Sequence, residues 1–187
     1  MTNKLLFFVL LALCFSGCDM LETHPYDVHI TGERELTNKN IQLIENKMQS
    51  KKTIRFAMIS DTQRWYNSTE DVVKALNARG DIDFVIHGGD QSDFGVTKEF
   101  IWMRDIFNKF QMPYVCLLGN HDCLGTGEDA YRAIYGDPNF AFTAGNVRFI
   151  CLNTNAMEYD YSEPVPDFNF IENELNNLSP EIEKTVF

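Results

Sequence analysis

Three short apolar runs, each beginning about 30 residues after the one before, constrain the fold of this chain more than any other feature. They occupy residues 53–59, 84–87 and 114–118, and each has the length of a buried β-strand. The segments between them have helical periodicity. Strand, helix, strand, helix, strand is the βαβ pattern, so we predict a parallel sheet with right-handed crossovers.

The two intervening segments predict helices that cover this sheet. In the first, Ser68 with an acid three residues later resembles a capping box, and Gly80 provides a stop. In the second, apolar side chains recur at helical spacing, and Pro113 ends the turn that follows. The apolar positions are Val72, Val73 and Leu76 in the first segment and Val96, Phe100, Met103, Phe107 and Phe110 in the second.

Acidic and amide side chains directly follow each of the three runs. Ligands of parallel sheets bind beyond the carboxyl ends of the strands, so these loops are expected to meet at one rim. The residues expected there are Asp61, Asp90, Asp93, Asn120, His121 and Asp122. Clustered carboxylates need a cation or raised pKa values, and mixed carboxylate, amide and imidazole ligands suit divalent Mn, Fe or Zn. Asp and Asn are also common turn residues, but three such loops in register favour a metal site.

Two of these loops carry motifs that resemble those of the calcineurin-like metallophosphoesterases. They are Gly89-Asp90-Gln91-Ser92-Asp93 and Gly119-Asn120-His121-Asp122. The resemblance covers roughly residues 53–187 and implies an α/β fold in which a sandwich of two β-sheets is flanked by helices. It also implies a hydrolase of phosphate esters, a phosphatase-type enzyme that uses two divalent metal ions.

The resemblance assigns roles to individual side chains. Asp61 would bind the first metal, Asp90 would bridge both metals, and Asn120 would bind the second. His121 would protonate the leaving oxygen, with Asp122 orienting its ring. Asp93 would lie next to the metal ligands without binding a metal itself.

The sequence departs from the family pattern in two ways. The first motif of the family is Asp-x-His, and its His is replaced here by Gln63, a poorer metal ligand that could still offer an oxygen. The sequence contains no histidine after His121, so the later lone His and the Gly-His-x-His motif are missing. We therefore expect weaker metal binding and impaired activity.

The C-terminal part predicts further strands and one helix. Residues 140–152 predict a hairpin or adjacent strands, an apolar stripe over residues 168–178 predicts a helix, and residues 184–187 predict the start of a strand. Because the chain stops within that last strand, we expect a fold that is incomplete at the C-terminus and a truncated reading frame.

The N-terminus resembles a bacterial lipoprotein signal. An apolar run over residues 5–15 is too short to span a bilayer, and it ends in Phe15-Ser16-Gly17-Cys18, which is similar to a lipobox. We expect Cys18 to carry the lipid that anchors the protein in the cell envelope, facing the periplasm or the cell exterior. An ordinary secretory signal is the alternative. Residues 19–52 are expected to form a tether and a lead-in element, followed by the domain over 53–187.

Composition limits the remaining classes of function. The net charge of −11 argues against nucleic-acid binding, which requires a basic surface. Cys116 and Cys151 lie in apolar runs and are expected in the core, and the position of Cys123 is open. The alternative to an enzyme is a non-catalytic membrane-anchored lipoprotein that retains the scaffold. A dinucleotide-binding domain is disfavoured because no Gly-x-Gly-x-x-Gly follows the first strand.

The proposed lipid anchor can be tested directly. Expressed in a bacterium, the protein should incorporate labelled palmitate and partition with membranes, and Cys18→Ser should abolish both, because lipidation would occur on that thiol. Unchanged labelling of the variant would exclude Cys18 as the anchor.

Overall fold

The computed structural model describes residues 24–49, 51–156 and 164–187. The expected signal segment and Cys18 lie outside these residues, so their structure is not described. None of the helices in the described ranges has the length and apolar character needed to cross a membrane. The elements, in chain order, are α2 (Leu36–Met48), β1 (Phe56–Ile59), α3 (Tyr66–Arg79), β2 (Phe84–His87), α4 (Thr97–Phe107), β3 (Tyr114–Cys116), the short 3-10 helix η1 (His121–Cys123), α5 (Gly127–Ile134), β4 (Phe140–Ala144), β5 (Val147–Cys151), α6 (Phe168–Asn176) and β6 (Lys184–Val186).

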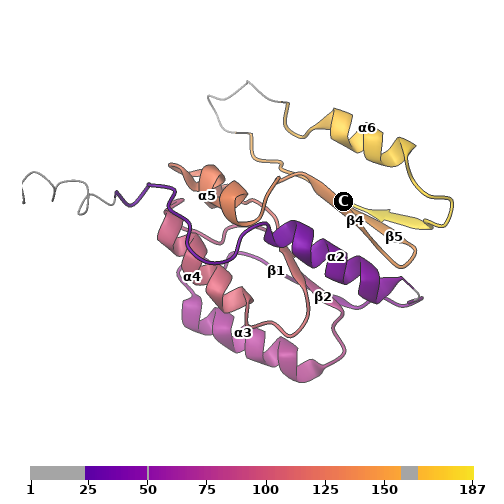
Figure 1. The fold of residues 1–187 in the computed structure, drawn as a ribbon, viewed down its shortest axis with the longest axis horizontal. Coiled ribbons are helices and arrows are strands. Elements are labelled where there is room, and N and C mark those ends of the chain that lie inside the picture. The colour runs from indigo at the N-terminus through magenta and orange to yellow at the C-terminus, as the bar shows by residue number, and fades with distance from the viewer. Residues whose placement is uncertain (1–23, 50, 157–163) are drawn as a thin grey trace, which may run out of the picture.

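The first sheet has the strand order β1-β2-β3, and all three strands are parallel. Phe56 is paired with Phe84, and His87 is paired with Cys116. The predicted parallel sheet is therefore confirmed. Because the strands run in the same direction, the loops that leave their carboxyl ends all emerge at one edge of this sheet (Figure 1).

Helices α3 and α4 pack against each other and on one face of this sheet. Phe100, Met103 and Phe107 of α4 are fully buried, as the spacing of apolar residues predicts. The capping prediction for α3 is wrong, because the helix begins at Tyr66 and places Ser68 inside its first turn. Gly80 ends α3 with a positive φ of 68°, a conformation that glycine adopts without steric cost.

The second sheet has the order β4-β5-β6 and faces the first across an aromatic core. Strands β4 and β5 form an antiparallel hairpin, and β6 runs parallel to β5. The ring of Phe142 stacks on Phe149 at 4.9 Å and meets Phe84 of the first sheet edge-on at 5.6 Å. Along β4, buried residues that include two phenylalanines alternate with less buried ones, so one face of the hairpin packs in this core. The expected sandwich of two sheets with flanking helices is confirmed.

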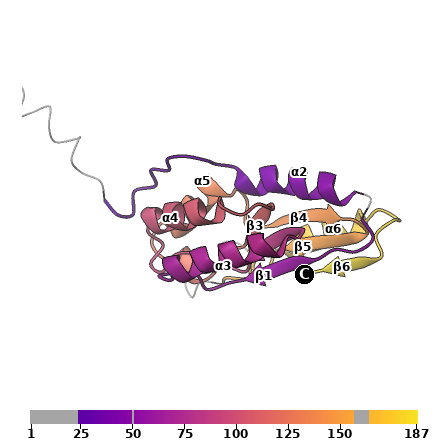
Figure 2. The same ribbon diagram turned by 90° about the horizontal axis from the view of Figure 1, so that it is seen from below.

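Helix α2 covers the side of the sandwich at which β3 and β4 lie. Figure 2 shows it on the opposite side of the molecule from β1. Its buried face includes Ile44 and Met48. At the opposite side, Met58 on the edge strand β1 is exposed.

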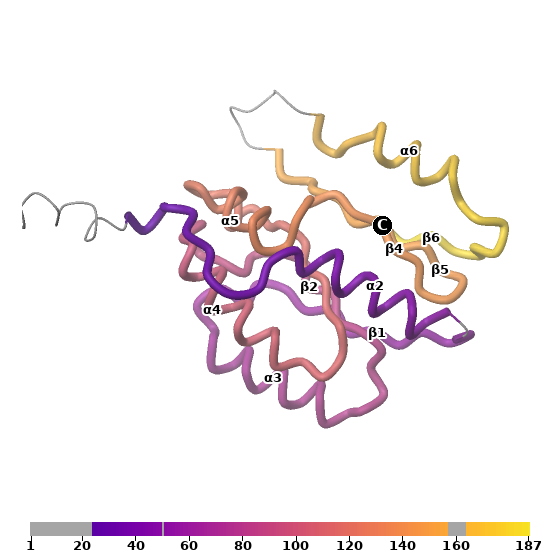
Figure 3. The backbone as a smooth tube through the Cα atoms, viewed as in Figure 1, coloured from indigo at the N-terminus to yellow at the C-terminus, as the bar shows by residue number. Residues whose placement is uncertain are grey.

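The described part of the expected tether is bound to the domain. Residues 24–35 run past α4 and α5 before they reach α2 (Figure 3). The hydroxyl of Thr97 donates to the carbonyl of Asp27 at 2.9 Å, and the buried guanidinium of Arg104 donates to the carbonyls of Thr31 and Glu33. The lead-in segment is thus an integral layer over α4, which the weak periodicity of residues 19–52 does not indicate.

The C-terminal helix α6 forms where the apolar stripe predicts it, but none of its described residues is buried. Phe168 is 63% exposed. Arg148 of β5 and Glu174 of α6 form an ion pair between this helix and the second sheet, and their closest atoms are 2.5 Å apart. The predicted strand near the C-terminus is present as β6. Cys116 and Cys151 are buried as expected, and Cys123 is half-buried with its thiol donating to the carbonyl of Gly119.

Two phenylalanines provide a matched test of this core. Phe142→Ala removes a fully buried ring between the two sheets and should lower the free energy of unfolding by about 3–5 kcal/mol. Phe168→Ala removes an exposed ring and should change it by less than about 0.5 kcal/mol. Urea unfolding followed by circular dichroism measures both. Equal losses would contradict the assignment of the core.

Candidate functional site

The loops that follow β1, β2 and β3 lie side by side and are joined by backbone hydrogen bonds. The N–H of Asp61 donates to the carbonyl of Gly89, and that of Gln63 donates to the carbonyl of Asp90, each at 3.1 Å. On the other side, the N–H of His121 donates to Oδ1 of Asp90 at 3.0 Å. Asp90 therefore occupies the middle loop, in contact with both neighbours.

The backbone of this rim takes unusual conformations. Asp61 and Asp90 have φ values of 56° and 61°, in the left-handed region that non-glycine residues seldom adopt. Each such residue costs on the order of 1 kcal/mol or more, and the surrounding contacts must hold it.

Two glycines allow the second and third loops to touch. A Cβ atom at Gly119 would lie 2.1 Å from Oδ1 of Asp90, and one at Gly89 would lie 2.7 Å from Cα of Gly119. Either contact is far inside the van der Waals distance. The close approach of these loops therefore requires glycine at both positions.

Asp122 fastens the third loop to the second. Its buried carboxylate accepts four backbone N–H groups at 2.8–3.0 Å, from Gly119, Asp90, Gln91 and Ser92. Burial raises the pKa of Asp122 to about 7, whereas the four donors favour its ionised form. Each oxygen already accepts two N–H groups, so an added proton would lack an acceptor, and we conclude that the carboxylate is ionised at neutral pH.

This arrangement corrects the expected role of Asp122. Both of its oxygens face backbone donors, and His121 is oriented by Asp93 instead. Nδ1 of His121 lies 3.0 Å from the carbonyl oxygen of Asp93 and 3.7 Å from its Oδ1. The hydrogen bond with that carbonyl raises the pKa of His121, with a further contribution from the carboxylates of Asp90 and Asp93. Nδ1 thus carries a proton and donates it to the carbonyl.

Two further residues support the rim, and neither was predicted from the sequence. The buried ring of His87 accepts the N–H of Gly89 at Nδ1, so its Nε2 carries the proton and donates to the hydroxyl of Thr62. Burial lowers the pKa of His87 to about 3, which keeps it neutral. Arg64 pairs with Asp93, with Nη2 and Oδ1 3.1 Å apart. The available signals were a histidine that ends an apolar run and a basic residue directly after the first motif.

A comparison with family models matches residues 54–181 of the chain to the calcineurin-like phosphoesterases. This match spans more than half of the sequence. The chain belongs to the calcineurin-like phosphoesterase family. Among solved structures, nine chains match, including a purple acid phosphatase isolated from yellow lupin (Lupinus luteus) seeds. No match was found among the curated proteins.

The lupin phosphatase shares the fold of this chain. The TM-score is 0.55 and the sequence identity is 15%, with 74% of this chain and 30% of the lupin chain covered. The chain therefore spans less than a third of the length of that neighbour. At this identity the likeness establishes the fold of the chain.

Membership of this family implies divalent metal ions, and the rim residues fit them in part. Oε1 of Gln63 and Oδ2 of Asp93 are buried and have no hydrogen-bond partner among the described residues, which leaves two oxygens available to a cation. Asp61 and Asn120 are exposed at the rim.

A complete cluster of ionisable ligands is absent from this rim. Within residues 24–49, 51–156 and 164–187, no group of three or more His, Cys, Asp or Glu side chains is placed to hold a metal ion. Of the four predicted metal ligands, only Asp61 and Asp90 are carboxylates, whereas Gln63 and Asn120 are amides.

The hydrogen bonds of Asp122 provide a test of the loop assembly. Asp122→Asn replaces one accepting oxygen with an NH2 group that faces backbone donors, and it should lower the free energy of unfolding by about 2–4 kcal/mol. Asp71→Asn, on the exposed surface of α3, is the matched control and should change it by less than about 0.5 kcal/mol. Thermal or urea unfolding of the two variants measures both changes. An unchanged stability of Asp122→Asn would mean that the carboxylate is not ionised.

Proposed function

We propose that this chain hydrolyses phosphate esters with two divalent metal ions bound at the rim formed by the three loops, and that Gln63 leaves this activity impaired. The observation that carries the proposal is the contact between Asp90 and His121. The hydrogen bond from the His121 N–H to Oδ1 of Asp90 places a carboxylate and an imidazole on adjacent loops at the carboxyl edge of the parallel sheet. Metal-assisted hydrolysis of a phosphate ester needs carboxylate ligands for the metals, and a proton donor beside them can assist the leaving oxygen.

The metal ligands in this proposal are Asp61, Gln63, Asp90 and Asn120. The unpartnered Oε1 of Gln63 supports its inclusion, because a buried amide oxygen without a hydrogen bond is costly unless a cation or water satisfies it. When bound, divalent cations supply Lewis acidity toward phosphoryl oxygens and lower the pKa of a coordinated water. Manganese, iron and zinc all accept such mixed oxygen ligands.

His121 is the proposed proton donor to the leaving oxygen. Its Nδ1–H is held by the carbonyl of Asp93, so proton exchange takes place at Nε2. Its side chain is 37% exposed, which leaves the ring accessible to a substrate. Asp93 is a positioning residue, since it fixes the tautomer and the orientation of the ring.

A non-catalytic lipoprotein that keeps the scaffold is the second candidate. Gln63 favours it, because this residue stands where the family pattern has an imidazole ligand, and an amide oxygen binds these metals more weakly. For either candidate we propose a location in the cell envelope, anchored through Cys18. That part of the proposal is supported by the sequence of residues 1–18 alone.

Removal of Asp90 separates the two candidates. With added manganese, the protein should hydrolyse para-nitrophenyl phosphate, and Asp90→Asn should lower the rate by more than about 100-fold, since even outer partners of metal ligands contribute 10–100-fold. Asp71→Asn, exposed on α3, should leave the rate unchanged. Equal rates for the protein and Asp90→Asn would support the non-catalytic scaffold.

Replacement of Gln63 tests the departure from the family pattern. Gln63→His should tighten manganese binding, measured by calorimetry, and raise the rate of hydrolysis, because imidazole is the better ligand. A neutral or harmful effect would show that Gln63 has another task, such as orienting water or substrate.

A further inference from the structure

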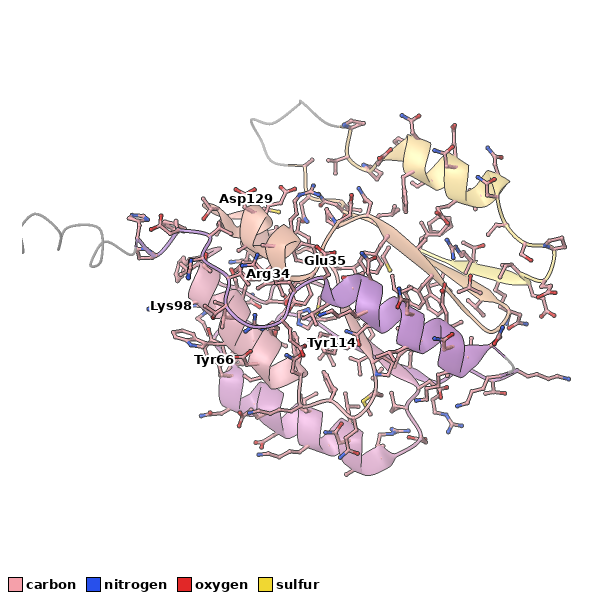
Figure 4. The ribbon with its side chains drawn as sticks, in the orientation of Figure 1. Arg34, Glu35, Tyr66, Lys98, Tyr114 and Asp129 are labelled. Atoms are coloured by element: carbon pink, nitrogen blue, oxygen red, sulfur yellow. The ribbon has the colours of Figure 1, made fainter. Side chains whose placement is uncertain are left out.

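Arg64 pairs with Asp93 at the rim but has no part in the chemistry proposed above. It lies in the loop between β1 and α3, two residues before Tyr66, which Figure 4 labels at the start of α3. Its φ of 67° is in the left-handed region, and its side chain is 68% exposed. The preceding residue, Gln63, is hydrogen-bonded to the carbonyl of Asp90. The guanidinium therefore projects from the same rim as the proposed metal ligands.

One residue, Asp93, contacts both Arg64 and His121, the first through its carboxylate and the second through its backbone carbonyl. The side chain of Asp93 is 2% exposed, and its Oδ1 lies 3.1 Å from Nη2 of Arg64 and 3.7 Å from Nδ1 of His121. Two basic side chains from different loops are thus brought to a common point. Asp93 supplies one oxygen to this pair, while its Oδ2 has no hydrogen-bond partner among the described residues.

A purely structural ion pair explains this geometry poorly. Arg64 leaves the second oxygen of Asp93 unsatisfied, and an exposed Arg contributes little to stability through such a pair. The planar guanidinium has five N–H donors, and the contact with Asp93 involves one of its terminal nitrogens. The remaining donors are available at the rim.

The acidic side chains of the rim are a reason for the remaining N–H donors of Arg64 to bind an anion. Asp61, Asp90 and Asp93 are acidic, and the whole chain has a net charge of −11, so an anionic phosphate ester would be repelled. Arg binds phosphoryl oxygens through parallel, charge-assisted hydrogen bonds and retains its charge at every physiological pH. A monoester offers two negative charges and three unsubstituted oxygens near neutral pH, whereas a diester offers one charge and two such oxygens.

We propose that Arg64, held by Asp93 beside His121, binds the phosphoryl group and selects phosphate monoesters over diesters. This inference rests on the proposed function and names its substrate class. The guanidinium contacts the unsubstituted oxygens of the phosphoryl group, and His121 lies on the side of the leaving oxygen. A diester would place its second substituent against Arg64 and lose one of these contacts.

The test compares Arg64→Met with the unaltered protein on two substrates, para-nitrophenyl phosphate and bis(para-nitrophenyl) phosphate, in the presence of manganese. Loss of a hydrogen-bonded charge contact should lower kcat/KM for the monoester by about 10- to 100-fold, chiefly through KM. The diester should change by less than about threefold. Arg64→Lys keeps the positive charge but lacks the paired N–H donors of the guanidinium, and it should lower kcat/KM for the monoester by an intermediate amount.

Arg55→Met is the matched control, because Arg55 is also an exposed Arg paired with an Asp but projects from the segment that precedes β1. It should leave both substrates unaffected. A parallel loss on both substrates, or an unchanged monoester rate in Arg64→Met, would overturn the proposal. If Arg64→Met does not fold, an Arg64→Lys variant with full monoester activity and unchanged KM overturns it equally.

Binding of inorganic phosphate separates this inference from the proposed function. If the unaltered protein proves inactive, the proposed hydrolysis fails, and calorimetric titration with phosphate in the presence of manganese still decides on Arg64. A dissociation constant raised about 10-fold or more in Arg64→Met but not in Arg55→Met would support the anion site. Identical phosphate binding by all three proteins would sink it.

Discussion

The carboxylate of Asp122 is the contact on which the arrangement of the rim depends. Its two oxygens bind four backbone N–H groups from two loops that are about 30 residues apart in the sequence. A buried carboxylate is stable only when such donors replace water. The buried N–H groups of Asp90, Gln91 and Ser92 in turn need an acceptor, and the same hydrogen bonds supply it. The parallel sheet brings the loops to one edge, and Asp122 fixes their separation.

That fixed separation allows strained backbone at the carboxylates themselves. Asp61 and Asp90 are both left-handed, and each is held by hydrogen bonds to the neighbouring loop. Gly89 and Gly119 remove the side chains that would otherwise keep the loops apart. Beneath them, the neutral ring of His87 connects Thr62 to Gly89 and so links the first loop to the second. Hydrogen bonds from the neighbouring loops thus stabilise the strained backbone at Asp61 and Asp90.

Much of this could be predicted from the sequence, because strands and helices follow from local periodicity. The parallel sheet, α4 with its buried face and the pairing of the polar loops at one rim are examples. Other features depend on contacts between distant residues. Asp93 and Asp122 could each have oriented His121, and only the path of the two loops decides between them. The apolar stripe of α6 predicts a helix correctly, yet it does not say whether a partner covers it, and Phe168 is exposed. The place of Arg64 at the rim was not predicted, because nothing in its local sequence indicates that Asp93 lies beside it.

The division of labour at the rim has a consequence for how such a site can diversify. Positions 89, 119 and 122 hold the backbone, and almost any replacement there would separate the loops. The side chain of Gln63 meets no such restriction, since its backbone N–H, not its side chain, joins the first loop to the second, and the side chain of Arg64 is 68% exposed. Mutational tolerance should therefore be concentrated at the residues that we propose to contact a ligand, so the metal or the substrate can change while the backbone of the rim stays the same.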